Sequence, residues 1–286
     1  MKRLQPILRT AIIAVFALTP CLAAAQPPDL TLARESNWLI IQGRHLPAGA
    51  VRINYLEAYC RANSTDAEWH HTTIGHTTEL ISLSDDKKTM KLRCRVKDGI
   101  IVDHTITASK DDVTFEIVAH NPTGQASGAH WAQPCIRLGD FTGYDDRGKD
   151  INDYLPKCFI FLDGKLTRMD DVQPWAEKAR YVPGQVWHPR DVPRTDVNPR
   201  PRSPLASSNG LIGCFSADER LILAVAFEPY QELFQGVARC LHSDFRIGGL
   251  MAGEAKRIYG KIYIVPPDIA ALVTRYAHDF PDQQGK

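Results

Sequence analysis

The sequence predicts an all-β fold, a large antiparallel β-sandwich with one helix near the C-terminus. In the first half of the chain, apolar residues alternate with polar ones over several segments, and this period of two is that of a strand with one face in a core. Short polar turns at residues 97–99 and 110–112 separate these segments, as in an antiparallel meander. Helical spacing is clear only close to the end of the chain, so the predicted class is all-β.

The strands can be placed from the alternation and from apolar runs between turn residues. They are expected over residues 51–55, 90–96, 100–106, 113–120, 132–138, 211–215, 221–227, 237–241 and 256–265. The helix is expected from Pro267 to about Tyr276, because proline suits a first helical turn. Ile269, Leu272 and Val273 then recur at helical spacing, which predicts one apolar helix face.

One long segment, residues 181–209, has no strand pattern. It contains six prolines, which exclude regular strand pairing. A loop of this length within a compact domain is usually functional or disordered. Because Tyr181 and Trp187 lie within it, we expect an ordered loop over one face of a sheet.

Composition limits the class of protein. The chain has 286 residues, of which 44% are hydrophobic and 23% charged, as in a globular protein. A formal net charge of +1 argues against a general nucleic-acid binder. No pattern separates two independent cores, so residues 26–286 are predicted to form a single β-sandwich domain.

The first 25 residues have the layout of a secretory signal peptide. Lys2, Arg3 and Arg9 precede an apolar stretch at residues 11–18, and small residues follow up to Ala25, where cleavage is expected. The apolar stretch is too short to span a bilayer, and no later segment is long and apolar enough. We therefore predict a secreted or periplasmic protein without a membrane span; a membrane anchor at the N-terminus is the alternative.

Export would place the remaining cysteines in an oxidising compartment, where disulfides form. Six cysteines follow residue 25, at positions 60, 94, 135, 158, 214 and 240. Cys60 and Cys94 are the first pair expected to be bridged, since each is predicted near a strand end in one early sheet. The alternative is that some of the six are buried free thiols. The wide spacing, without any C-x-x-C, argues against a zinc knuckle.

Residues 102–122, VDHTITASKDDVTFEIVAHNP, resemble the mid-chain hairpin of the galactose mutarotase-like supersandwich superfamily. In that superfamily two long strands lead to an asparagine at the start of an active-site loop. The resemblance implies a supersandwich and a carbohydrate ligand, because epimerases, lyases, sugar hydrolases and sugar-binding proteins share this fold. It transfers no catalytic residue to this chain.

The densest group of polar and aromatic residues lies between residues 120 and 144. A sugar site needs a flat apolar surface for the ring and planar hydrogen-bonding groups for the hydroxyls. His130, Trp131, Gln133 and Arg137 are residues of these types. We expect Trp131 to stack on a ligand, Gln133 and Arg137 to bind it, and His130 to act as an acid. A packed tryptophan with satisfied polar neighbours is the alternative.

Glu228 directly follows the apolar run 221–227, which predicts a buried strand. A carboxylate at the end of such a strand is partly removed from water, and this raises its pKa toward the range useful for proton transfer. Glu228 is therefore a candidate catalytic base. An exposed glutamate at a strand end is the alternative.

His242, Asp244 and Arg246 occupy alternate positions, so an extended strand would place them on one face. A carboxylate beside an imidazole can fix its tautomer and raise its basicity, and an arginine can bind a substrate carboxylate. His242 is a second candidate base, Asp244 would orient it, and Arg246 would bind substrate. The alternative is a surface Asp–Arg pair beside a solvated histidine.

Arg200 is a further candidate for substrate binding, since the proline-rich loop could hold it over a groove at low entropic cost; a basic structural loop is the alternative. No cofactor is expected, because the sequence contains no H-E-x-x-H, EF-hand, P-loop, nucleophile elbow or dinucleotide fingerprint. A metal ion, if bound, would be held by His130, His242 and Asp244 brought together by folding.

These observations favour an exported carbohydrate-active enzyme that carries out acid–base chemistry at a sugar carbon, as an epimerase, a lyase or a hydrolase. Glu228 or His242 would be the base. The alternative is a non-catalytic glycan-binding or cell-envelope protein on the same fold, or a structural exported domain. In the first two cases the partner is a carbohydrate, and no nucleic acid is expected.

Overall fold

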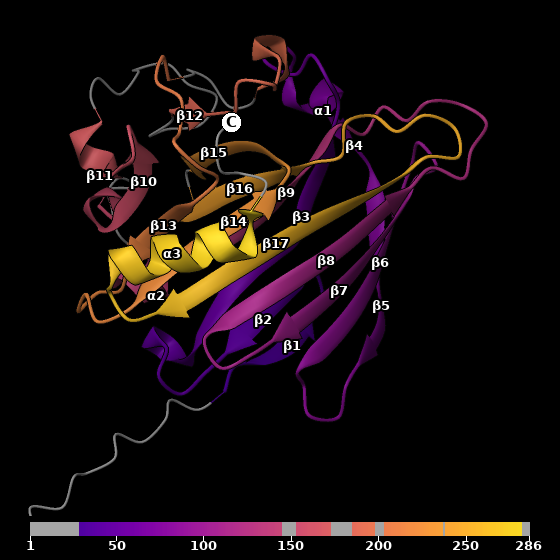
Figure 1. Cartoon of the computed structure of the whole chain (residues 1–286). Helices are drawn as coiled ribbons and strands as arrows, with labels where there is room; N and C mark the ends of the chain where they lie inside the picture. Colours follow the sequence, from indigo (N-terminus) through magenta and orange to yellow (C-terminus); the bar gives the residue numbers. More distant parts are fainter. Residues whose placement is uncertain (1–28, 145–152, 173–184, 198–202, 237, 282–286) are drawn as a thin grey trace, which may run out of the picture.

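The structure is a computed structural model that describes residues 29–144, 153–172, 185–197, 203–236 and 238–281 (Figure 1). The predicted signal peptide and Arg200 lie outside these residues. The described chain forms two antiparallel sheets, of eight and nine strands, which pack on each other through a shared hydrophobic core. The prediction of an all-β sandwich is confirmed.

The eight-stranded sheet holds most of the predicted site residues. From one edge to the other it consists of β1 (Thr31–Glu35), β2 (Trp38–Gln42), β3 (Ala50–Cys60), β9 (Trp131–Arg137), β16 (Cys240–Arg246), β15 (Tyr230–Gly236) and β12 (Val186–Trp187), with β4 (Thr73–Ile74) paired to β3. Its inner face contributes Ile53, Ile136 and Phe245 to the core. Its outer face therefore carries the residues that alternate with these.

The nine-stranded sheet contains the predicted meander. Its order is β11 (Lys165–Arg168), β10 (Cys158–Leu162), β13 (Ile212–Phe215), β14 (Ile222–Glu228), β17 (Ala255–Val265), β8 (Asp112–His120), β7 (Ile101–Ala108), β6 (Thr89–Val96) and β5 (His76–Leu83). Strands β6, β7 and β8 are consecutive neighbours, as expected from the turns at residues 97–99 and 110–112, and β5 extends the meander by one strand outside the predicted ranges. Leu92, Val225 and Ile262 face the core between the sheets.

The predicted C-terminal helix is α3 (Ile269–Asp279), which covers the outer face of the nine-stranded sheet (Figure 1). Asp268 caps its N-terminus by accepting a hydrogen bond from the amide of Ala271, a common way to begin a helix. Leu272 and Tyr276 pack on Ile222 in a second core cluster. Two further helices of one turn, α1 (Trp69–Thr72) and α2 (Gly139–Thr142), lie in connections.

Two predictions about strands need correction. The strand expected at 237–241 is β16, which begins at Cys240, and the predicted ranges do not include β1, β2, β4, β5, β10, β11, β12 or β15. Gln231, Glu232 and Gln235 of β15 are fully buried polar residues, so the strand lacks the apolar alternation by which it could be recognised. The short 3-10 helices η1 (Pro47–Gly49), η2 (Leu155–Lys157), η3 (Met169–Asp171) and η4 (Arg194–Asp196) complete the described elements.

The predicted disulfide between Cys60 and Cys94 is wrong in this structure. Cys60 ends β3 of the eight-stranded sheet, whereas Cys94 lies within β6 of the other sheet. All six cysteines of the described residues are buried free thiols. The expectation failed because alternation assigns a residue to a strand but does not say which sheet the strand joins.

In the described part of the chain, no helix is long and apolar enough to cross a membrane.

Candidate functional site

A cavity of about 500 Å³ lies beside the end of β14 and the start of β15. Three other segments complete its wall: the β10–β11 turn, residues 189–191 and residues 205–209. The last two belong to the proline-rich segment, whose strand β12 pairs with β15. Two described parts of the predicted loop therefore line this cavity.

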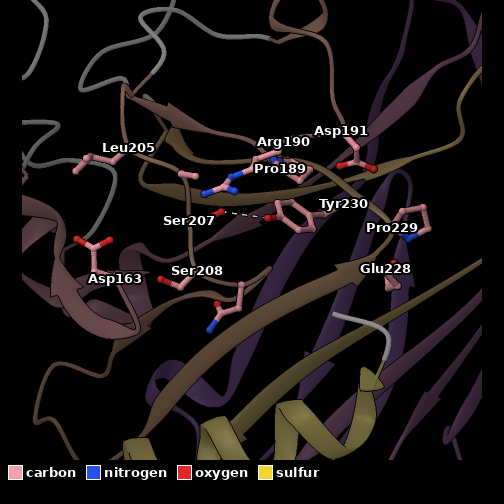
Figure 2. A pocket seen from close by; sticks show the side chains of 12 residues that line it. Asp163, Pro189, Arg190, Asp191, Leu205, Ser207, Ser208, Glu228, Pro229 and Tyr230 are labelled. Carbon is pink, nitrogen blue, oxygen red and sulfur yellow. Dashed lines mark hydrogen bonds between the residues drawn. The ribbon is translucent and has the colours of Figure 1, made fainter. Parts of the chain in front are cut away.

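Tyr230 occupies the middle of this cavity and Glu228 one end, with Asp163 at the other end (Figure 2). The Tyr230 hydroxyl is 3.1 Å from the hydroxyl of Ser207. Burial raises the pKa of Tyr230 to about 12, so its hydroxyl stays neutral and retains a proton to donate. Because Tyr230 is only 5% exposed, it supplies the cavity with its hydroxyl group and only a small part of its ring.

The wall of the cavity is fixed by hydrogen bonds between its segments. The amide of Gly164 donates to the hydroxyl of Ser208 at 2.7 Å, which joins the β10–β11 turn to residues 205–209. The amide of Gly210 donates to the hydroxyl of Tyr276 on α3 at 3.1 Å. A side chain at Gly210 would be 3.1 Å from the Tyr230 ring, so glycine lets this segment lie against the ring.

The cavity carries an excess of negative charge. Asp163, Asp191 and Glu228 contribute three carboxylates, and Arg190 contributes one guanidinium. Lys256, which interacts electrostatically with Glu228 and Asp191, has a pKa lowered by burial. The cavity therefore favours a neutral or cationic polar ligand over an anionic one.

The other predicted residues lie elsewhere. His130 and Arg246 meet at Asp196 of η4: the His130 Nδ1 is 3.9 Å from Asp196 Oδ2, and Arg246 donates to the same oxygen at 3.1 Å. Burial lowers the pKa of His130 and raises that of Asp196. This network joins η4 to β16.

Trp131 was expected to stack on a ligand, but it is fully buried. Its ring packs with Ala58, Cys60 and Trp69 in a small cluster at the end of β9 and β3. A ring with no exposed face cannot stack on a sugar, so the alternative of a packed tryptophan holds in this structure.

Gln133, His242 and Asp244 form a third group on the outer face of the eight-stranded sheet. Gln133 donates to Asp244 Oδ2 at 2.8 Å, and Asp244 Oδ1 is 3.2 Å from His242 Nδ1. All three residues are buried. Gln133 and His242 line a void of only about 50 Å³, which is too small for a sugar ring and large enough for a water molecule or an ion.

Arg137 lines the same void, but its guanidinium is used structurally. It donates to the carbonyl of Ala238 at 3.1 Å and lies over the ring of Trp38, 5.5 Å from the ring centre. Such cation–π contacts hold an arginine in place. The structure thus puts Arg137 beside His242 and away from the cavity lined by Glu228 and Tyr230.

Two cysteines, Cys135 and Cys240, lie next to His242, although no role at this site was predicted for them. The ligand-capable atoms of Cys135, Cys240 and His242 all lie within 4.8 Å of one another. The structure therefore groups His242 with two thiols, not with His130 as expected for a metal. Cys240 stands two residues before His242, so the strand alternation that linked His242 to Asp244 could also have identified it.

The electrostatics of this group favour an anionic sulfur. A hydrogen bond with Cys135 and the nearby His242 hold the pKa of the Cys240 thiol well below its usual range. Burial would lower the pKa of His242, but Cys240 and Asp244 together raise it well above its usual value. Burial raises the pKa of Asp244 to about 6.

A scan against protein-family models finds no match, and no curated protein matches either. Among solved structures, the chain is similar to a candidate aldose 1-epimerase of Escherichia coli K12 (12% identity, TM-score 0.44, 83% of this chain and 99% of that one). It is also similar to the Slr1438 protein of Synechocystis sp. PCC 6803, with 10% identity and a TM-score of 0.44 over 87% of this chain and 100% of that one. A galactose mutarotase-like protein of Lactobacillus casei gives 7% identity and a TM-score of 0.42, covering 82% and 100%. At these identities and TM-scores, neither a family nor a residue role is transferred to this chain.

Proposed function

We propose that the chain binds a neutral sugar in the 500 Å³ cavity and that Glu228 is the proton acceptor there. The observation that carries this is the clustering of Glu228, Tyr230 and Arg190 with two further carboxylates around one cavity. Its volume lies within the range of about 300–1,000 Å³ typical of small-molecule sites. Sugar sites combine an aromatic surface with carboxylates and guanidinium groups that pair with hydroxyls.

Glu228 has the position that acid–base chemistry requires. It is half-buried and is the last residue of β14, whose residues 222–227 are all buried. A carboxylate in such a place can accept a proton from a sugar hydroxyl or from a carbon next to a carbonyl. The reaction class we propose is therefore proton transfer at a sugar, as in an epimerase, a lyase or a hydrolase.

Non-catalytic glycan binding is the second candidate. It is favoured by the exposure of Asp163, Arg190 and Asp191. Their charged groups are accessible to water and can form hydrogen bonds with sugar hydroxyls without any proton transfer. In this case Glu228 would be a hydrogen-bond acceptor. The two functions differ in turnover, not in the place where the ligand binds.

A panel of neutral mono- and disaccharides tests both candidates, with binding measured by calorimetry and products by NMR. We expect a sugar to bind the wild type. Glu228→Gln should bind it at least about tenfold more weakly or lose turnover, and Glu116→Gln should change neither binding nor turnover. Glu116 is a matched control because it is exposed on β8 of the same sheet and does not line the cavity. Binding without product would support the second function, and no binding of any sugar would remove both.

We also propose that the protein is exported after cleavage behind Ala25. The support is the sequence pattern of a basic segment, an apolar segment and small residues. Expression of the full chain followed by fractionation and N-terminal sequencing tests this. A mature N-terminus at Gln26 outside the cytoplasm is expected, and an uncleaved intracellular chain would contradict it.

A further inference from the structure

The group around His242 has the composition of a metal site. Cys240 and His242 lie on β16 and Cys135 on the adjacent strand β9. Their ligand atoms are all within 4.8 Å of one another, and all three side chains are buried. Because the three residues project from one face of paired strands, their positions are fixed by the sheet and not by a loop.

The distance between Cys240 and His242 matches two ligands of a tetrahedral ion. Zinc binds sulfur at about 2.3 Å and imidazole nitrogen at about 2.0 Å, so two such ligands on a tetrahedron lie about 3.5–3.6 Å apart. The distance from Cys240 Sγ to His242 Nε2 is 3.5 Å. The side chain of Glu57 could take a fourth position, since its Oε2 is 3.9 Å from the same nitrogen.

The partners of His242 also suit a metal ligand. Its Nδ1 faces Asp244, which leaves Nε2 directed at the two thiols. Metal-binding histidines commonly use the second ring nitrogen to donate to a carboxylate, which orients the ring and raises its basicity. Gln133 holds that carboxylate, and Phe234 stacks on the imidazole with ring centres 4.2 Å apart.

There is room for an ion at this point. The void of about 50 Å³ is lined by Cys135, Cys240, His242 and Glu57, and one water-sized sphere suffices for a monatomic ion. A side chain at Gly236 would be 2.6 Å from Cys240 Sγ. Glycine therefore keeps the space beside the sulfur open.

We propose that Cys135, Cys240 and His242 bind a zinc ion, with Glu57 or water as the fourth ligand. Two thiolates and an imidazole are a donor set for zinc, and hard cations such as Mg²⁺ and Ca²⁺ prefer oxygen. Both thiols lose their protons on binding, and their two negative charges balance the charge of the ion. The site is separate from the sugar cavity and does not depend on the proposed function.

Metal titration of the full chain tests the proposal. The protein is reduced, stripped with a chelator, and titrated with ZnCl₂ or, in parallel, with CoCl₂. We expect one equivalent of zinc, a thiolate-to-cobalt charge-transfer band, and sulfur neighbours at about 2.3 Å in X-ray absorption of the zinc form. Absence of stoichiometric binding, or a zinc shell without sulfur, overturns the proposal. Because this result uses the wild type, it does not depend on the folding of any variant.

Variants identify the ligands. Cys240→Ser is expected to weaken zinc binding about 100-fold or more. Asp244 only positions His242, so Asp244→Asn should weaken zinc binding about 10–100-fold and retain the cobalt band. Cys214→Ser is the control, because Cys214 is an equally buried thiol in the other sheet, and it should bind zinc as the wild type does. Equal loss in Cys214→Ser and Cys240→Ser would contradict the assignment. Glu228→Gln should leave zinc binding unchanged whether or not the sugar proposal holds.

Discussion

Gln133 and Asp244 are joined by a buried hydrogen bond of 2.8 Å from Gln133 Nε2 to Asp244 Oδ2, although 111 residues separate them in sequence. The second oxygen of Asp244 faces His242. Both carboxylate oxygens are thus engaged on the outer face of the eight-stranded sheet. This arrangement explains how a fully buried carboxylate is tolerated.

Gln133→Leu should destabilise the protein. Leucine has a similar size but leaves Asp244 Oδ2 without its donor, and an unsatisfied buried acceptor costs about 1–3 kcal/mol. Denaturant unfolding monitored by circular dichroism measures the change. Gln125→Leu is the control, since Gln125 is exposed, and an equal loss in both variants would argue against the role given to this hydrogen bond.

Acid should destabilise the fold through His104. This histidine is buried in the core, with Nδ1 2.9 Å from the Tyr55 hydroxyl, and burial lowers its pKa from 6.5 to about 3. Between these values the unfolded chain binds a proton that the folded chain does not. The free energy of unfolding should therefore fall as pH drops below about 6.5, by about 4–5 kcal/mol once pH 3 is reached.

Unfolding curves at pH 7 and pH 4.5 measure this effect. His104 should account for a decrease of about 2–3 kcal/mol over that interval, and His104→Phe should show a decrease smaller by that amount. His120→Gln, at an exposed position, should behave like the wild type. If His104→Phe keeps the full pH dependence, His104 is not its source.

Gly260→Ala should disturb both the core and the cavity. Gly260 faces Phe227 across β17 and β14, and an added Cβ would overlap the phenylalanine ring. Overpacking of this kind costs about 1–3 kcal/mol. Because Phe227 directly precedes Glu228, a shift of its ring should also weaken sugar binding. Gly124→Ala, where a Cβ meets nothing within 4 Å, should change neither the free energy of unfolding nor the affinity.

The charge of the cavity predicts its ligand preference. Three carboxylates face the guanidinium of Arg190 and the nearby ammonium of Lys256, which leaves one carboxylate unbalanced. One unbalanced charge near a ligand charge is worth about 1 kcal/mol in a largely aqueous setting, so a uronic acid should bind about fivefold more weakly than the corresponding neutral sugar. Parallel calorimetric titrations test this, and stronger binding of the uronate would contradict the account.

The fold was largely predictable because alternation and turns are local signals. Residues 90–96, 100–106 and 113–120 became β6, β7 and β8 almost as expected, since one face of each strand meets the core. Strand β15 could not be recognised because Gln231 and Glu232 are buried polar residues. Gln231 is accommodated by donating a hydrogen bond to the carbonyl of Asp196 in the distant η4 segment.

The site was predictable only in parts. Spacing on one strand correctly paired His242 with Asp244, because neighbours at i and i+2 share a face. It could not show that Glu228, at the end of a strand in the other sheet, lies in a separate cavity with Asp163 and Arg190. That grouping depends on which strands pair and on where the proline-rich segment crosses them.

The most direct test of the sugar-binding account is a crystal of the protein soaked with a neutral monosaccharide that binds in the calorimetric panel. The account predicts the sugar in the cavity of Figure 2, with a ring hydroxyl within hydrogen-bond distance of Glu228 and the ring near Tyr230. A sugar bound at another surface, with this cavity empty of it at saturating concentration, would contradict the account.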